Sequence, residues 1–249
     1  MKKKSLCIIF AALIAISLSG CIIVNFGDGF SGRGVSGKGE LESYKIDVGA
    51  FNSLRIEGYC DIKYYNDPSY EVTFAVQPNL REYFVLEVKN GELIVRTTRM
   101  IRAGRGKTPV LTISVPELIS VTIQGAGTFT AHDTINTDTF TLNISGAGNC
   151  YANLAVNKVY VEMSGACDLD LSGSAETAHF RLSGAGDLDA LKMETREVRI
   201  ELAGAGNVKV YCTEHLFISA SGAGDIEYRG SPRIDMSKSG VVTIRQISR

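Results

Sequence analysis

A short motif of small residues recurs through the second half of the chain. Gly125-Ala126-Gly127 is followed by five further copies at steps of 21, 19, 19, 20 and 18 residues, and Ser239-Gly240 resembles a degraded last copy. A repeat of about 20 residues is typical of solenoids, because so small a unit cannot bury its own apolar face and stacks on its neighbours. The glycines of the motif are Gly125, Gly127, Gly146, Gly148, Gly165, Gly184, Gly186, Gly204, Gly206, Gly222 and Gly224.

Apolar and polar residues alternate on both sides of each copy. Val121 and Ile123 precede the first copy, and Phe129 and Ala131 follow it. This period of two predicts strands with one buried face. Each unit is therefore a strand, a Gly-Ala-Gly corner, a second strand and a polar return. Parallel crossovers are usually right-handed, and the six-residue subperiod of left-handed β-helices is absent. We predict an all-β fold, a right-handed parallel β-helix-like solenoid of about six to seven rungs of 18–21 residues.

The glycines at the corners are expected to adopt positive φ, where the strand bends. On this interpretation Gly184→Val destabilises the fold strongly, because a β-branched side chain fits positive φ badly. The third copy reads Gly165-Ala166-Cys167, so that a Cys stands where the other copies have their second Gly.

Residues 41–116 lack the motif but also predict strands. Leu86 to Val95 reads as a hairpin around an Asn-Gly turn. The stretch from Leu54 to Ile62 echoes the repeat, with Tyr-Cys in place of Ala-Gly. We expect an irregular N-terminal β segment over residues 41–116 and the solenoid repeats over residues 117–249.

The N-terminus is typical of an exported lipoprotein. A basic start and a short apolar run lead to Leu18-Ser19-Gly20-Cys21, which looks like a bacterial lipobox. This predicts a signal peptide over residues 1–20 and lipidation of Cys21, so that the membrane is a partner through the lipid anchor. An ordinary signal peptide with a chance Cys is the alternative. The Gly-rich residues 21–40 are predicted to be a flexible tether.

Ile22 follows the lipobox, where Asp tends to retain lipoproteins of familiar Gram-negative bacteria at the inner membrane. We therefore predict an outer membrane lipoprotein of the cell envelope. The sequence leaves open whether it faces the periplasm or the cell surface.

Composition excludes several classes of partner and cofactor. The net charge of −1 provides no general field that attracts nucleic acid. No Cys-x-x-Cys motif exists and the three His are far apart, so we expect no metal and no cofactor. An exported chain permits disulfides, but free buried thiols are equally compatible with the sequence. The cysteines that leave this question open are Cys60, Cys150, Cys167 and Cys212.

Several of these features together resemble the head GIN domain family, bacterial proteins described as heads of auto-transporter adhesins. The resemblance rests on the lipobox, the opening Phe51-Asn52-Ser53-Leu54-Arg55-Ile56, the hairpin Lys89-Asn90-Gly91-Glu92-Leu93 and the serial Ser-Gly-Ala-Gly-Asp units, and it covers about residues 44–230. It implies a right-handed β-helix-like fold and a role in adhesion, and it brings no catalytic residues. Cys60 and Cys167 depart from the glycine pattern of the corners.

Acidic residues follow the corner in two neighbouring units. Stacking would bring these four carboxylates together, and a divalent cation bound by oxygen ligands would relieve their repulsion. The interpretation we favour is that Asx side chains cap the corner through local hydrogen bonds, while the second row is a solvated face. The candidate cation or ligand face consists of Asp168, Asp170, Asp187 and Asp189.

A basic stretch precedes Pro109. It is either a solvated loop or a site for an acidic glycan or a lipid headgroup. Its members are Arg96, Arg99, Arg102, Arg105 and Lys107.

The sequence contains no Gly-x-Ser-x-Gly or His-Glu-x-x-His motif. We predict a lipid-anchored β-solenoid of the cell envelope, an adhesin or binding module without catalysis whose partner is a glycan or a host or cell-surface protein. One alternative is a carbohydrate-active enzyme on a β-helix that uses the paired Asp residues as acid and base. A second alternative is an envelope scaffold without a ligand.

Overall fold

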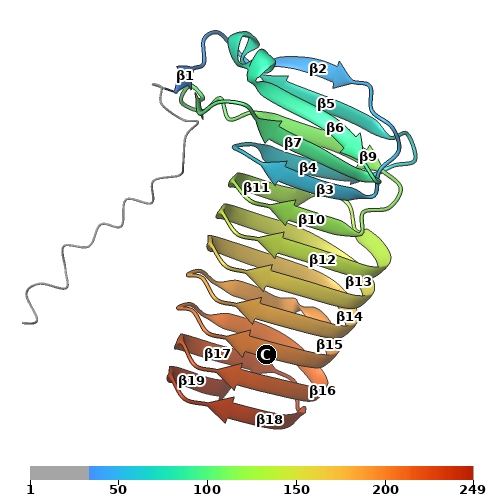
Figure 1. Cartoon of the computed structure of the whole chain (residues 1–249). Coiled ribbons are helices and arrows are strands. Elements are labelled where there is room, and N and C mark those ends of the chain that lie inside the picture. Colours follow the sequence, from blue (N-terminus) through green and yellow to red (C-terminus); the bar gives the residue numbers. More distant parts are fainter. Residues whose placement is uncertain (1–33, 249) are drawn as a thin grey trace, which may run out of the picture. The chain divides into compact units, whose positions relative to one another are not determined.

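The computed structural model describes residues 34–248, which wind into a β-solenoid of about seven turns (Figure 1). The near strands run toward the left edge while successive coils descend toward the C-terminus, which is a right-handed path. The predicted fold class is confirmed. The predicted signal peptide, the lipidation site Cys21 and most of the tether lie outside the described residues. Within residues 34–248, no helix has the length and apolar character needed to cross a membrane.

One parallel sheet forms the near side of the solenoid in Figure 1, and we call it the front sheet. It contains β3 (Ser53–Glu57), β10 (Ser120–Ile123), β12 (Ile135–Ile144), the final parts of β13 (Ala147–Met163), β14 (Ala166–Leu182), β15 (Leu188–Leu202) and β16 (Val208–Ala220), and β18 (Arg233–Lys238). Equivalent apolar residues of successive repeats pair in register, so that like stacks on like inside the core. These buried residues are Val121, Leu142, Val161, Phe180, Ile200 and Ile218.

A second parallel sheet begins at the corners. It contains β4 (Asp61–Asn66), β11 (Ala126–Ala131), the first parts of β13 to β16, β17 (Ala223–Arg229) and β19 (Val241–Gln246). Its buried row is Phe129, Cys150, Leu169, Leu188, Val208 and Ile226. The returns, which we expected to be polar, also add to the core, since Leu154, Met193 and Cys212 are buried there.

Both glycines of a Gly-Ala-Gly corner lie against a carbonyl of the preceding coil, but only the second also has a positive φ. The second glycine, for example Gly186, has a φ of 148°, a backbone conformation that L side chains rarely adopt. The first glycine, for example Gly184, has no positive φ, so our expectation of positive φ is wrong there. A Cβ on Gly184 would instead lie 2.0 Å from the carbonyl oxygen of Gly165 in the preceding coil. That oxygen accepts a hydrogen bond from the N–H of Ala185 at 2.9 Å, so close stacking of coils excludes a side chain.

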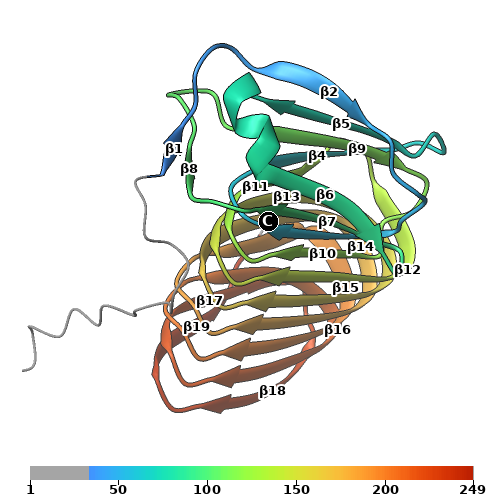
Figure 2. The same cartoon turned by 45° about the horizontal axis from the view of Figure 1, so that its top comes forward.

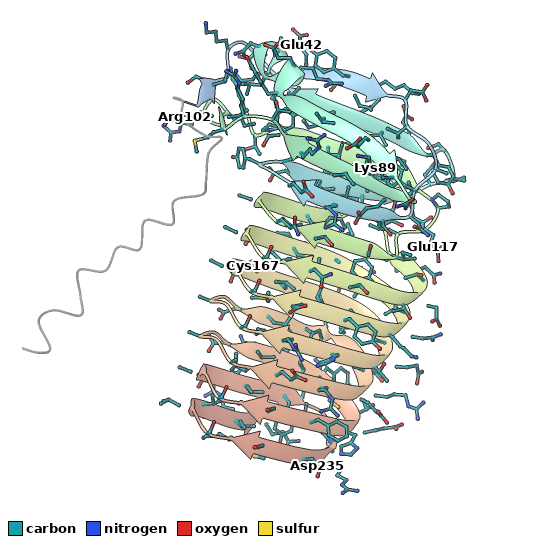
Figure 3. All side chains as sticks on the ribbon, in the orientation of Figure 1. Glu42, Lys89, Arg102, Glu117, Cys167 and Asp235 are labelled. Carbon is teal, nitrogen blue, oxygen red and sulfur yellow. The ribbon has the colours of Figure 1, made fainter. Side chains whose placement is uncertain are left out.

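Cys60 and Cys167 occupy the column of the second glycine. Their carbonyl oxygens lie 1.9 Å from where a Cβ would be placed on Gly127 and Gly186, respectively. Neither Cys has positive φ, and both side chains are buried in the core. Figure 3 shows Cys167 at the corner edge of the stack. All four cysteines of the described chain are free thiols.

The N-terminal segment closes one end of the solenoid (Figures 1 and 2). β7 (Glu92–Thr97) pairs in parallel with β3, and β9 (Val110–Val115) pairs in parallel with β4. Antiparallel strands extend this end, since β6 (Phe84–Lys89) pairs with β7, β5 (Glu71–Val76) with β9, and β2 (Glu42–Ile46) with β5. The predicted Asn90-Gly91 hairpin joins β6 to β7, with positive φ at both turn residues. The order of coils therefore differs from the order in sequence.

The other end of the described chain is an open coil formed by β18 and β19. Met236 continues the buried row of Ile218 but is 56 % exposed, because no described strand covers it. Lys238 stands in register with the buried Ala220. A charged residue at an inward position discourages further strands from pairing with this edge.

Candidate functional site

The four predicted aspartates come together beside the corners, in the neighbouring coils of β14 and β15. Asp170 and Asp189 are direct partners in the strand register. A groove of about 310 Å³ passes over these residues, and we call it the corner groove. Its polar lining consists of Tyr151, Asp168, Asp170, Asp187, Asp189, Asn207 and Lys209.

Several of these side chains hold one coil to the next. Asp168 Oδ1 accepts a hydrogen bond from the backbone N–H of Asp187 at 3.0 Å. Asp187 Oδ1 in turn accepts one from the N–H of Asn207 at 2.8 Å, and Asn207 Oδ1 accepts one from the N–H of Asp225 at 3.0 Å. A local bond occurs instead at Asp189, in the row that we expected to be only solvated, where Oδ1 accepts the N–H two residues ahead at 3.0 Å. The other bonds run between coils, so these residues form a ladder along the corner.

The charge in the corner groove is partly compensated. Lys192 Nζ lies 3.9 Å from Asp170 Oδ2. Among residues 34–248, no group of three or more His, Cys, Asp or Glu side chains is arranged to hold a metal ion. The interaction that the structure does show for Asp168 and Asp187 is hydrogen bonding to the backbone of the next coil.

A second candidate is the outward side of the front sheet, which we call the front face. Its side chains alternate with the buried ones and stack in rows, one residue per coil. The central row is Thr141, Tyr160, His179, Arg199, Phe217 and Asp235. The flanking rows are Thr139, Lys158, Thr177, Glu197, His215 and Arg233 on one side, and Asn143, Glu162, Arg181, Glu201, Ser219 and Ser237 on the other.

Aromatic and cationic groups of the front face contact one another. The rings of Tyr160 and His179 meet edge to face at 6.3 Å between centroids. The ring of His215 stacks on Phe217 at 3.8 Å, and Arg199 Cζ lies 4.7 Å from the centroid of the same Phe217 ring. Such contacts hold the rings in place and leave part of their faces at the surface.

Carboxylates hold the two histidines of the front face. Glu201 Oε1 lies 3.0 Å from His179 Nε2, and its other oxygen is 2.8 Å from an Arg181 guanidinium nitrogen. Burial raises the pKa of Glu201, but the hydrogen bonds from His179 and Arg181 together keep the pKa below its ordinary value. Asp235 Oδ2 lies 2.8 Å from His215 Nε2 on the last coils, where Figure 3 labels Asp235.

Two depressions adjoin on the front face. One, of about 220 Å³, is lined by Tyr160, His179, Arg199 and Phe217 among others. The second, of about 330 Å³, is lined by Tyr160 and His179 again, together with Arg181. The two depressions share Tyr160 and His179 and together make up a shallow surface that crosses several coils. Tyr160 is 43 % exposed within it.

The front face was not predicted from the sequence, because the repeat pattern marks the inward residues of each unit. A signal was nonetheless present. In four successive units an aromatic or cationic residue stands four places before the Ser or Ala that precedes the corner. These residues are Tyr160, His179, Arg199 and Phe217.

The N-terminal segment and the repeats both match the model of a described family. The family model for "putative auto-transporter adhesin, head GIN domain" matches residues 50–232. The chain belongs to the head GIN domain family. The resemblance drawn from the lipobox, the hairpin and the corner units is confirmed. No curated protein matches the sequence.

Solved structures of other proteins share this fold. One, named a "putative adhesin", from Bacteroides fragilis, has a TM-score of 0.78 at 24 % identity and covers 86 % of this chain and 100 % of its own. A "putative lipid binding protein" from Parabacteroides distasonis has a TM-score of 0.70 at 20 % identity, covering 87 % and 100 %. A "putative adhesin" from Parabacteroides merdae has a TM-score of 0.63 at 20 % identity, with the same coverage. At these identities the likeness shows the fold.

Proposed function

We propose that this chain is a non-catalytic binding module of the cell envelope, and that the front face binds an extended glycan. The observation that carries the proposal is the pair of adjoining depressions that Tyr160 and His179 both line, with Phe217 in one of them. Aromatic faces pack against the C–H faces of sugar rings, while carboxylates and guanidinium groups exchange hydrogen bonds with hydroxyls. Coils spaced by about 4.8 Å repeat at nearly the length of one sugar in an extended polysaccharide.

The family supports a binding role. Its description and the names of two similar structures refer to adhesins. Fold alone does not assign a ligand, so the choice of a glycan rests on the aromatic and charged side chains of the front face.

The corner groove supports a structural role better than an enzymatic one. A general acid and a general base need carboxyl oxygens that are free to exchange protons with a substrate. Asp168 and Asp187 each use an oxygen to accept a backbone hydrogen bond from the next coil. The proposed function therefore includes no catalysis.

Anchoring is the second part of the proposal. Lipid on Cys21 would hold the module at the outer membrane, and the support for this is the lipobox sequence. A binding module tethered at the envelope fits a family described as adhesins.

Two tyrosines of one strand provide a matched test of the front face. Tyr160 and Tyr151 both lie on β13 and are 43 % and 45 % exposed, but the first lines the front face and the second the corner groove. The purified protein is tested against neutral and acidic polysaccharides by affinity electrophoresis, with calorimetry on any that retard it. Tyr160→Ala should weaken glycan binding by at least about tenfold, whereas Tyr151→Ala should leave the affinity unchanged.

Three other results would contradict parts of the proposed function. Weaker binding in Tyr151→Ala alone would place the ligand in the corner groove. Release of new reducing ends from a bound polysaccharide would show that the protein is an enzyme. Binding to a surface protein, with no glycan retained by the native chain, would overturn the assignment of a glycan.

A further inference from the structure

The basic stretch pairs with the first strand of the described chain. β1 (Val35–Ser36) pairs in parallel with β8 (Ile101–Arg102), and Figure 2 shows the two side by side. The N–H of Val35 donates to the carbonyl oxygen of Met100 at 2.9 Å, and the N–H of Gly37 donates to that of Arg102 at 2.8 Å. Residues far apart in sequence are thus joined at the N-terminal end of the described chain.

Polar side chains around η1 (Pro78–Tyr83) fix this arrangement. Gln77 is buried; its Nε2 donates to the Gly39 carbonyl at 2.9 Å, and its Oε1 accepts from the Gly104 N–H at 2.9 Å. Asn79 Nδ2 donates to the Ser36 carbonyl at 2.9 Å. The first strand and the basic loop therefore keep one geometry relative to each other.

Only part of the basic stretch is neutralised. Arg96 lies 3.6 Å from a carboxyl oxygen of Glu87, and Lys107 lies 2.6 Å from one of Glu40. The remaining basic residues are exposed, and within residues 34–248 they form no ion pair. Met100, which is 54 % exposed, adds an apolar side chain. We call this surface the basic patch, and it consists of Lys38, Arg99, Met100, Arg102 and Arg105.

We propose that the basic patch docks on the anionic phospholipid headgroups of the membrane that carries the anchor, an inference that rests on the proposed lipid at Cys21. Thirteen peptide units join Cys21 to Gly34, and they span at most about 47 Å. The anchor therefore limits Gly34 to within about 47 Å of the lipid, a distance from which the basic patch can reach the membrane surface. Exposed cations within about 10 Å of an anionic surface are attracted to it at moderate salt.

Charge distinguishes the basic patch from the rest of the molecule. The whole chain carries a net charge of −1, whereas the basic patch carries four cations without an ion-pair partner in the described chain. A lipid anchor and a basic patch together hold a protein at a membrane more firmly than one acyl chain alone. Met100 gives the patch a side chain that can enter the headgroup region between the arginines.

The absence of Trp from the sequence makes a clean experiment possible. Met100→Trp places the only indole of the chain in the basic patch. Val241→Trp is the matched control, because Val241 is 85 % exposed on the open coil at the opposite end. The full chain, produced in bacteria with its own N-terminus, is reconstituted into phosphatidylcholine vesicles, with or without phosphatidylglycerol, whose acyl chains carry bromine as a fluorescence quencher.

We expect quenching of Met100→Trp in phosphatidylglycerol vesicles, and no quenching of Val241→Trp. High salt should abolish the effect. Replacing Arg99, Arg102 and Arg105 by Gln should weaken docking about fivefold for each residue. Far-UV circular dichroism checks that the variants fold.

Equal quenching in neutral and anionic vesicles, or equal quenching of the two reporters, would overturn the proposed docking. Flotation separates this result from failure of the anchor. Protein that floats with vesicles at high salt, but is never quenched in anionic vesicles, is anchored and does not dock. Protein that does not float at all would refute the lipid anchor and the docking together.

Discussion

Replacing Gly184 by Ala adds one methyl group where two coils of the solenoid touch. The new Cβ would lie 2.0 Å from the Gly165 carbonyl oxygen, whereas ordinary van der Waals contact begins near 3.4 Å. The coils must therefore separate locally by about 1.4 Å, because backbone on both sides leaves no flexible side chain to move aside. The hydrogen bond from the Ala185 N–H to the same oxygen, now 2.9 Å, cannot survive that displacement.

The cost follows from these two losses. Overpacking costs about 1–3 kcal/mol, and a lost backbone hydrogen bond costs about 0.5–1.5 kcal/mol. Together they lower the free energy of unfolding by about 3 kcal/mol. For a chain of this length each kcal/mol lowers Tm by about 2–4 °C, so Gly184→Ala should melt about 6–12 °C below the native protein. Gly184→Val should lose more, for the same steric reason.

Two other glycines separate coil contact from backbone strain. Gly49 has neither a positive φ nor a neighbour within 4 Å of its Cβ position, so Gly49→Ala should not lower Tm. Gly106 has a φ of 69° in open space, so Gly106→Ala reports strain alone, about 1–2 kcal/mol. Thermal and urea unfolding are followed by far-UV circular dichroism. If Gly184→Ala melts within about 2 °C of the native protein, the coils are not packed as the structure has them.

Two further predictions concern buried and corner side chains. Burial raises the pKa of Tyr64 to about 12, and its hydroxyl has no hydrogen-bond partner in the described chain. Tyr64→Phe should therefore raise stability at pH 8 by about 1 kcal/mol. The variant should also lack the loss of stability that ionisation of Tyr64 causes between pH 10, where an unfolded Tyr ionises, and pH 12. Thermal melts at pH 8 and pH 11 test both effects, and a lower Tm at pH 8 would contradict the first. Asp187→Ala should lower Tm by about 2–4 °C through loss of the hydrogen bond from the Asn207 N–H. Asp187→Asn keeps an acceptor, so its Tm should fall by less. Equal losses of Tm would point to the charge of Asp187 and favour the cation hypothesis.

The coil was predictable because each repeat unit contains the strand before the corner and the strand after it. Val121 and Ile123 before the corner, and Phe129 after it, show the period of a half-buried strand, and they are buried in register with the next copies. The reason for the first glycine was not predictable in the same way. It depends on a carbonyl of the preceding coil, and a sequence pattern does not show how closely two coils approach.

The irregular N-terminal strands were predicted, but their pairing with the solenoid escaped prediction for a topological reason. The hairpin around Asn90-Gly91 is a local signal and was found, whereas the parallel pairing of β7 with β3 joins segments that share no motif. The contact between β1 and β8 likewise depends on Gln77 and Asn79, whose side chains bridge loops distant in sequence. Long-range polar contacts of this kind leave no periodic trace.

The rows of the solenoid differ in how much the fold constrains them. This difference distinguishes residues that the fold requires from residues that are available for binding. At the corners, neighbouring carbonyls exclude side chains, so Gly recurs in nearly every copy. On the front face the outward side chains differ from coil to coil, and Tyr160 and Phe217 place aromatic rings there that contact neighbouring His and Arg side chains. Aromatic surface left in water is unfavourable, and the buried rows already supply the core. The fold thus accounts for the glycines and for the corner Asx residues, whereas the exposed part of the Tyr160 ring is the surface that the proposed glycan would cover.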